Sequence, residues 1–131
     1  EPLIESIKSN FLYRYNQITE LKIPSTVINI ENEAFANCRS LIEFVIPSSV
    51  NNICNYAFEN CKNLVKIDIP SSTASIGLGC FTNFQSLTQI SISSSATSIS
   101  DNCFANCSKL TEILIPSSVT KIGKFAFVHC S

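Results

Sequence analysis

The chain has 131 residues, of which 45% are hydrophobic and 15% are charged, and its formal net charge is −1. This length and apolar content predict one domain with a buried core, spanning residues 1–131. The near-neutral charge offers no electrostatic basis for binding nucleic acid or an anionic membrane. No apolar run reaches the roughly 18 residues of a membrane-spanning helix, so we expect no membrane insertion.

Residues 1–17 become interpretable when they are shifted by 23 positions. Apolar residues then coincide with apolar residues of the following segment. The shift places Ile4 on Val27, Ile7 on Ile30, Phe11-Leu12 on Ala34-Phe35 and Tyr15 on Cys38. We interpret residues 1–17 as a degenerate N-terminal half-repeat.

From residue 18 onward a unit of 23 residues recurs without a gap. Its shared pattern is Leu-x-x-Ile-x-Ile-Pro-Ser-Ser-Val-x-x-Ile-x-x-x-Ala-Phe-x-Asn-Cys-x-x, and the predicted repeats are 18–40, 41–63, 64–86, 87–109 and 110–131. Such a period predicts a solenoid, in which units too small to bury their own apolar face stack on one another. Because the chain stops before the leucine triplet that would begin a further repeat, we expect a fragment of a longer array, or an end that another element covers.

The spacing within the unit predicts two extended segments. The second half of Leu-x-x-Ile-x-Ile alternates as a strand does, and the following proline ends that strand because it has no N–H to donate. Ser-Ser then turns the chain, and Val-x-x-Ile forms a second, shorter extended piece on the opposite wall. The unit from Thr73 to Ala96 is the least regular, because Ser93 replaces the proline and Phe84 the cysteine.

The end of the unit predicts a compact turn and two columns of stacked side chains. We expect residues 32–36 and their equivalents to form one or two helical or 3-10 turns. The polar residue after each turn suits the left-handed conformation, and repeated amides could hydrogen-bond along the solenoid. This column is Asn37, Asn60, Asn83, Asn106 and His129. The aromatic column, predicted to stack in single file, is Phe35, Phe58, Phe81, Phe104 and Phe127.

The seven cysteines cannot all pair with one another, because their number is odd. Six of them occupy two repeat columns that elsewhere hold Phe or Ala, which marks apolar packing sites. Column neighbours lie within reach of a disulfide, but we expect inward thiols to stay reduced. The neighbouring pairs considered are Cys38 with Cys61 and Cys80 with Cys103. Cys54 lies outside both columns, so we predict that it is the most exposed or reactive thiol.

No catalytic or metal-binding motif accounts for any residue better than packing does. A zinc site built from Cys103, Cys107, His129 and Cys130 is conceivable. The repeat columns explain each of these residues without a metal, so we favour packing. The serines that follow the prolines are turn formers, because no single base could serve all of them. We therefore predict that the chain is not an enzyme and needs no metal or cofactor.

The motif Ile-Pro-Ser-Ser-Val-x-x-Ile-Gly-x-x-Ala-Phe-x-x-Cys at residues 115–130, with a related copy at 46–64, resembles the BspA-type leucine-rich repeat. The resemblance covers nearly the whole chain. It implies a β-rich, α/β-type leucine-rich-repeat solenoid: a right-handed curved coil with a parallel concave sheet, short convex strands, and short helical or 3-10 turns. It also implies a cell-surface or secreted protein that adheres to a protein partner on a host or on other cells.

The predicted recognition face lies on the concave sheet, because solenoids present large, rigid surfaces there. An exposed apolar patch with a polar rim would mark the contact. The predicted partner-binding residues are Ile42, Glu43, Val45, Val65, Lys66, Asp68, Gln89, Glu112 and Leu114. The predicted function is a non-catalytic protein–protein interaction module. The alternative is a scaffold component of a larger cytoplasmic assembly, bound to a neighbouring subunit, which reduced thiols would suit.

Overall fold

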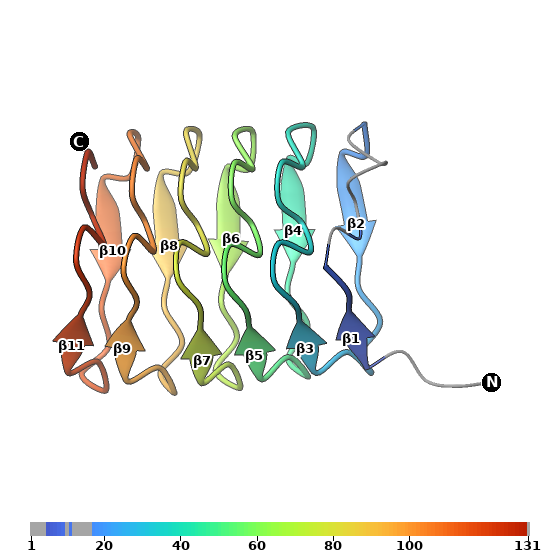
Figure 1. Ribbon diagram of the computed structural model, residues 1–131, viewed down its shortest axis with the longest axis horizontal. Helices are drawn as coiled ribbons and strands as arrows, with labels where there is room; N and C mark the ends of the chain where they lie inside the picture. The colour runs from blue at the N-terminus through green and yellow to red at the C-terminus, as the bar shows by residue number, and fades with distance from the viewer. Residues whose placement is uncertain (1–4, 10, 12–16, 131) are drawn as a thin grey trace.

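The computed structural model describes residues 5–9, 11 and 17–130, and these residues form a parallel β-solenoid (Figure 1). Eleven short strands are assigned in them, and successive strands from β2 onward alternate between two walls as the chain coils. Sheet partners pair in register at an offset of 23 residues, as Ile7 pairs with Ile30. The stacked solenoid that the period predicts is confirmed.

One wall is a five-stranded parallel sheet with the strand order β10-β8-β6-β4-β2. Its strands are β2 (Glu20–Lys22), β4 (Glu43–Val45), β6 (Lys66–Asp68), β8 (Gln89–Ser91) and β10 (Glu112–Leu114). The middle residue of each strand packs inward, whereas the two residues beside it are exposed. This is the wall that the sequence predicts to be concave. We call its outward side, including the residue before each strand, the five-stranded face.

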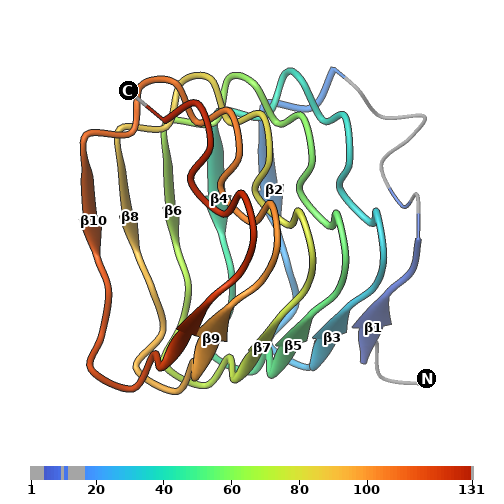
Figure 2. The same cartoon turned by 60° about the vertical axis from the view of Figure 1, so that its left-hand side comes forward.

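The opposite wall is a row of short strands along the other side of the coil (Figure 2). Each strand has two residues, and the hydrogen-bonded ladder is interrupted once. One sheet contains β1 (Ser6–Ile7), β3 (Asn29–Ile30), β5 (Asn52–Ile53) and β7 (Ser75–Ile76), and a second contains β9 (Ser98–Ile99) and β11 (Lys121–Ile122). At the break, the Ser100 hydroxyl donates to the Ile76 carbonyl at 2.7 Å. One turn earlier, the backbone N–H of Gly77 donates to the Ile53 carbonyl at 2.8 Å. The break falls in the unit that the sequence marks as least regular.

The core between the walls is organised by the predicted phenylalanine column. Neighbouring rings from Phe35 to Phe127 stack with centroids 5.3 to 5.7 Å apart and interplanar angles of 7° to 19°. Phe44 of β4 packs edge-on against both Phe35 and Phe58. The single file of aromatic rings is confirmed, and it fixes the register of each repeat on the next.

The prediction of helical or 3-10 turns is wrong, because the described residues contain hydrogen-bonded turns and no helix. Alternate backbone N–H groups in these segments donate to acceptors in different repeats. The N–H of Ala34 bonds within its own turn to the Glu31 carbonyl at 3.2 Å, whereas the N–H of Phe35 bonds to the Ala57 carbonyl of the next repeat at 2.8 Å. Since every second donor serves the neighbouring repeat, a continuous helix cannot form.

The residue after each turn adopts the left-handed conformation, as predicted. The φ angles of Asn37, Asn60, Asn83, Asn106 and His129 lie between 59° and 65°. Three amides also form the expected ladder, since Nδ2 of Asn60, Asn83 and Asn106 donates to Oδ1 of the asparagine in the preceding repeat at 2.6 to 2.9 Å. A second left-handed column precedes the first by four residues: Glu33, Tyr56, Gly79, Asn102 and Phe125. It was not predicted, because these residue types share no conformational preference.

Two sequence expectations have limited counterparts in the structure. Ile4, Leu12 and Tyr15 of the N-terminal half-repeat lie outside the described residues. Phe11 is described, and its ring packs edge-on against Phe35 with centroids 6.3 Å apart.

None of the described residues forms a helix long and apolar enough to cross a membrane.

Candidate protein-binding face

All nine predicted partner-binding residues are exposed on the five-stranded face. The apolar members are exposed to an unusual degree, since 75% of Val45 and 78% of Leu114 are accessible to solvent. Ile42 and Val65 are each 46% exposed. β-strand alternation explains the exposure of Val45 and Leu114, because the residue before each packs inward, whereas Ile42 and Val65 lie just before their strands. Exposed apolar side chains on a rigid sheet are typical of contact surfaces.

Three of the predicted apolar residues, Ile42, Val45 and Val65, lie close to Glu43 and form an exposed apolar patch. Ile42 and Val65 are neighbours, because the Val65 N–H donates to the Ile42 carbonyl at 3.4 Å. Val45 lies at the other end of β4, where it is paired in register with Lys22 of β2. An open hollow of about 430 Å³ over β4 and β6 is lined by both Val45 and Val65. The structure thus brings the patch together around one carboxylate.

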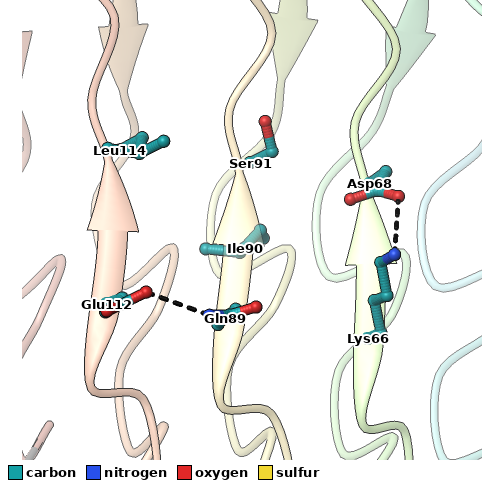
Figure 3. Close-up of a pocket in the computed structure, with 7 residues that line it drawn as sticks. All are labelled: Lys66, Asp68, Gln89, Ile90, Ser91, Glu112 and Leu114. Carbon is teal, nitrogen blue, oxygen red and sulfur yellow. Dashed lines mark hydrogen bonds and ion pairs between the residues drawn. The ribbon is translucent and has the colours of Figure 1, made fainter.

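Polar side chains toward the C-terminal end of the face form one ion pair and one hydrogen bond (Figure 3). The Lys66 Nζ atom lies 3.7 Å from Oδ2 of Asp68, two residues further along β6. The Gln89 Nε2 atom donates to Glu112 Oε2 at 2.9 Å across the β8–β10 pair. Leu114 lies beyond them at the end of β10, and a hollow of about 270 Å³ joins these three strands.

The N-terminal end of the face differs, because its charges are unpaired. Glu20 of β2 and Glu43 of β4 are register partners, and no ion pair engages either carboxylate within the part of the chain that the structure describes. These two residues and Lys22 line a hollow of about 1030 Å³ over β2 and β4. Glu20 and Lys22 are not among the predicted partner-binding residues. Their membership of the same repeat columns as Glu43 and Val45 was the available signal.

The repeat, the two parallel walls and the exposed face agree with a known family. A family model described as BspA type Leucine rich repeat region (6 copies) matches residues 5–131. The chain belongs to the BspA-type leucine-rich repeat family. Leucine-rich repeats are generally protein-interaction modules and are typically non-catalytic. No curated protein matches the chain significantly.

Solved structures of bacterial proteins share this fold. The T. pallidum protein TpLRR is 30% identical, with a TM-score of 0.80 over 83% of this chain and 51% of its own. A leucine rich cell surface protein from Faecalibacterium prausnitzii is 28% identical, with a TM-score of 0.68 over 87% of this chain and 40% of its own. The pneumococcal vaccine antigen PcpA is 30% identical, with a TM-score of 0.74 over 86% of this chain and 28% of its own. The chain therefore spans about half of TpLRR and less of the other two.

The cysteines of this BspA-type array are all free thiols, and those of the two columns mainly fill the core. The Cys107 thiol donates to the Phe81 carbonyl at 3.3 Å. Burial is the main cause that raises the pKa of Cys103 and of Cys107 to about 12. Among the described residues, no cluster of three His, Cys, Asp or Glu side chains could hold a metal ion.

The structure supports the expected exposure of Cys54, which Cys130 shares, but not its expected reactivity. Its side chain is half-buried, as is that of Cys130, whereas the other five cysteines are buried. Partial burial, with the nearby charge of Glu31, raises the pKa of Cys54. Because the thiolate is the nucleophile, Cys54 is partly accessible but not activated.

The raised pKa of Cys103 predicts a loss of stability in alkaline solution. The unfolded chain ionises this thiol near its ordinary value of 9.0, whereas the folded chain holds the proton up to about pH 12. The stabilisation is complete below pH 9 and is lost as the pH rises from 9 to 12, at about 1.4 kcal/mol per pH unit. Cys103→Ala, which introduces the residue found elsewhere in this column, should reduce the decrease in the free energy of unfolding between pH 9 and pH 12 by about 1.4 kcal/mol per pH unit.

Urea unfolding under reducing conditions at pH 8 and pH 10.5 measures this difference in slope. Cys54→Ala is the control and should change the slope less, because Cys54 is only half-buried. Equal pH dependence in the parent chain and in Cys103→Ala would contradict the assignment.

Proposed function

We propose that this chain is a non-catalytic module that binds a partner protein on its five-stranded face, and that it acts in adhesion at a cell surface. The observation that carries the proposal is the succession of three open hollows along this face, with solvent-exposed Val45 and Leu114 beside them. Open hollows on an exposed sheet suit a protein surface better than a small ligand, which pockets usually enclose. Two structural relatives are described as a cell surface protein and a vaccine antigen, which supports the surface location.

A double substitution at the centre of the face tests the binding site. Val45→Ala with Lys66→Ala should weaken binding at least tenfold, because truncation of central interface residues commonly costs more than about 1.4 kcal/mol. The free energy of unfolding should change by less than about 0.5 kcal/mol per site, because both side chains are exposed. The partner is first captured by photo-crosslinking from position 45 in the native setting, and its Kd is then measured by biolayer interferometry.

The matched control lies on the opposite wall, where Lys8 and Ile28 also provide an exposed lysine and an exposed aliphatic side chain. Lys8→Ala with Ile28→Ala should leave the Kd within twofold of the parent chain. If this control pair weakened binding and the Val45 and Lys66 pair did not, the binding face would have been assigned to the wrong wall.

The second candidate function is a scaffold component of an intracellular assembly, which the seven free thiols favour. A thiol titration of the protein isolated from its natural source, denatured under nitrogen, separates the two candidates. Seven titratable thiols would support the scaffold in a reducing compartment. Fewer than seven, with pairs between column neighbours, would support the oxidising cell surface.

A further inference from the structure

We propose that the N-terminal end of the five-stranded face binds an extended segment of the partner protein in which a lysine or arginine and an apolar residue lie two positions apart. The cation would lie over Glu20 and Glu43, and the apolar side chain would lie over Val45. This inference rests on the proposed function and adds the chemistry of the partner to it.

Two negative charges lie side by side at the N-terminal end of the five-stranded face. Glu20 and Glu43 are register partners on adjacent strands, so their carboxylates lie on neighbouring positions of one row and repel each other. The next acidic residue of the face, Asp68, is already neutralised by Lys66 at 3.7 Å. Lys66 is also the register partner of Glu43, but its ammonium lies toward Asp68, and within the described residues no salt bridge is formed by Glu20 or Glu43. A guest cation placed between the two carboxylates would relieve their repulsion.

Val45 provides an exposed apolar surface beside these carboxylates. Val45 is 75% exposed, and it lines both the hollow over β2 and β4 and the hollow over β4 and β6. The edges of these hollows are also apolar, because Pro47 borders the first and Pro70 the second. Covering Val45 with an apolar side chain would remove this surface from water.

The spacing of Glu43 and Val45 allows one extended segment to contact both. Glu43 and Val45 are two residues apart on one strand, so their side chains leave the same side of the sheet. Two residues of an extended chain span about 6.6 Å, which is also the separation between alternate residues of a partner segment. A partner in extended conformation can therefore place alternate side chains over Glu43 and Val45 together.

Lys22 sets the direction of the bound segment. On the β2 side of β4, the positive Lys22 is the register partner of Val45, whereas the negative Glu20 is the register partner of Glu43. A segment that binds in the opposite direction would place its own cation next to Lys22. The face therefore favours a partner cation at the end marked by Glu20 and Glu43.

The test uses ¹⁵N-labelled protein and a blocked octapeptide of sequence Thr-Arg-Thr-Ile-Thr-Arg-Thr-Ile, followed by two-dimensional NMR. We expect the peptide to shift the amide signals of Glu20, Glu43 and Val45 with a millimolar or lower Kd. The same peptide with Glu in place of Arg should bind at least tenfold more weakly. Glu20→Gln with Glu43→Gln should weaken the Arg peptide roughly fivefold. Glu112→Gln, a distant carboxylate of the same face, should not weaken it.

Each other outcome overturns a defined part of the inference. Equal binding of the Arg and Glu peptides on these strands would refute the charge selection and leave the binding face in place. Shifts confined to β5, β7 and β9 would refute both this inference and the proposed face. No shift with either peptide at 5 mM would refute the predicted partner chemistry, while the Val45 and Lys66 double substitution would still test the face independently.

Discussion

Phe58→Ala is expected to lower the free energy of unfolding by about 3–5 kcal/mol, the range seen when a buried phenylalanine is truncated. Phe58 is fully buried and stacks on Phe35 at 5.3 Å and on Phe81 at 5.7 Å. It also contacts Phe44 edge-on at 5.1 Å. The substitution therefore weakens the interfaces with both neighbouring repeats at once. In a linear array, the free energy of unfolding is the sum of the stabilities of the repeats and of the interfaces between neighbours. A residue that contacts both neighbouring repeats therefore affects two interfaces, whereas a terminal residue affects one.

Urea unfolding followed by circular dichroism measures this loss, and the shape of the curve is a second readout. When the central interface is weakened, the two halves of the array can unfold independently. The urea titration would then show two transitions or a reduced m-value. Phe125→Ala is the control, because this phenylalanine is 65% exposed and should cost less than about 0.5 kcal/mol. A loss below 1 kcal/mol for Phe58→Ala would show that the aromatic column does not hold the repeats together.

Asn83→Ala is expected to cost about 2–4 kcal/mol, although the side chain is small and polar. Its φ of 63° is left-handed, which costs a residue with a Cβ roughly 1–2 kcal/mol. Its amide donates to Asn60 at 2.6 Å and accepts from Asn106 at 2.9 Å, and each such bond contributes about 0.5–1.5 kcal/mol. Alanine loses both bonds and lacks the local polar contact that lets asparagine adopt this conformation.

Asn83→Gly separates the two causes, because glycine adopts positive φ without steric cost but makes no side-chain bond. We expect it to cost about 1–2 kcal/mol, so the difference between the two variants reports the backbone strain and the remainder reports the ladder. Chemical denaturation of both variants gives the numbers, with the exposed Gln85→Ala as a control near zero. Equal losses for alanine and glycine would show that the left-handed backbone contributes nothing at this position.

Positions that recur with one residue type could be read from the sequence. The phenylalanine stack, the turn after each proline and the left-handed asparagines all follow from a single side chain with a strong preference, repeated every 23 residues. Ser93 shows that the turn survives the loss of proline, since the Ala96 N–H still bonds to the residue 93 carbonyl at 3.1 Å. The outward positions of the strands could also be predicted, because alternation on a strand depends only on spacing.

Features that depend on competition between neighbouring repeats could not be read from the sequence. The turns are not helical because half of their N–H groups bond to the next repeat, and that choice exists only when the repeats are stacked. The pairing of Lys66 with Asp68, which leaves Glu20 and Glu43 without a partner, likewise depends on side-chain positions across three strands. The amino-acid pattern thus specifies a stack of equivalent coils, because identical apolar side chains must share one interior. Which hydrogen bonds and charges remain available for a partner is decided only after the coils are in contact, since each group bonds to whichever neighbour lies nearest in space.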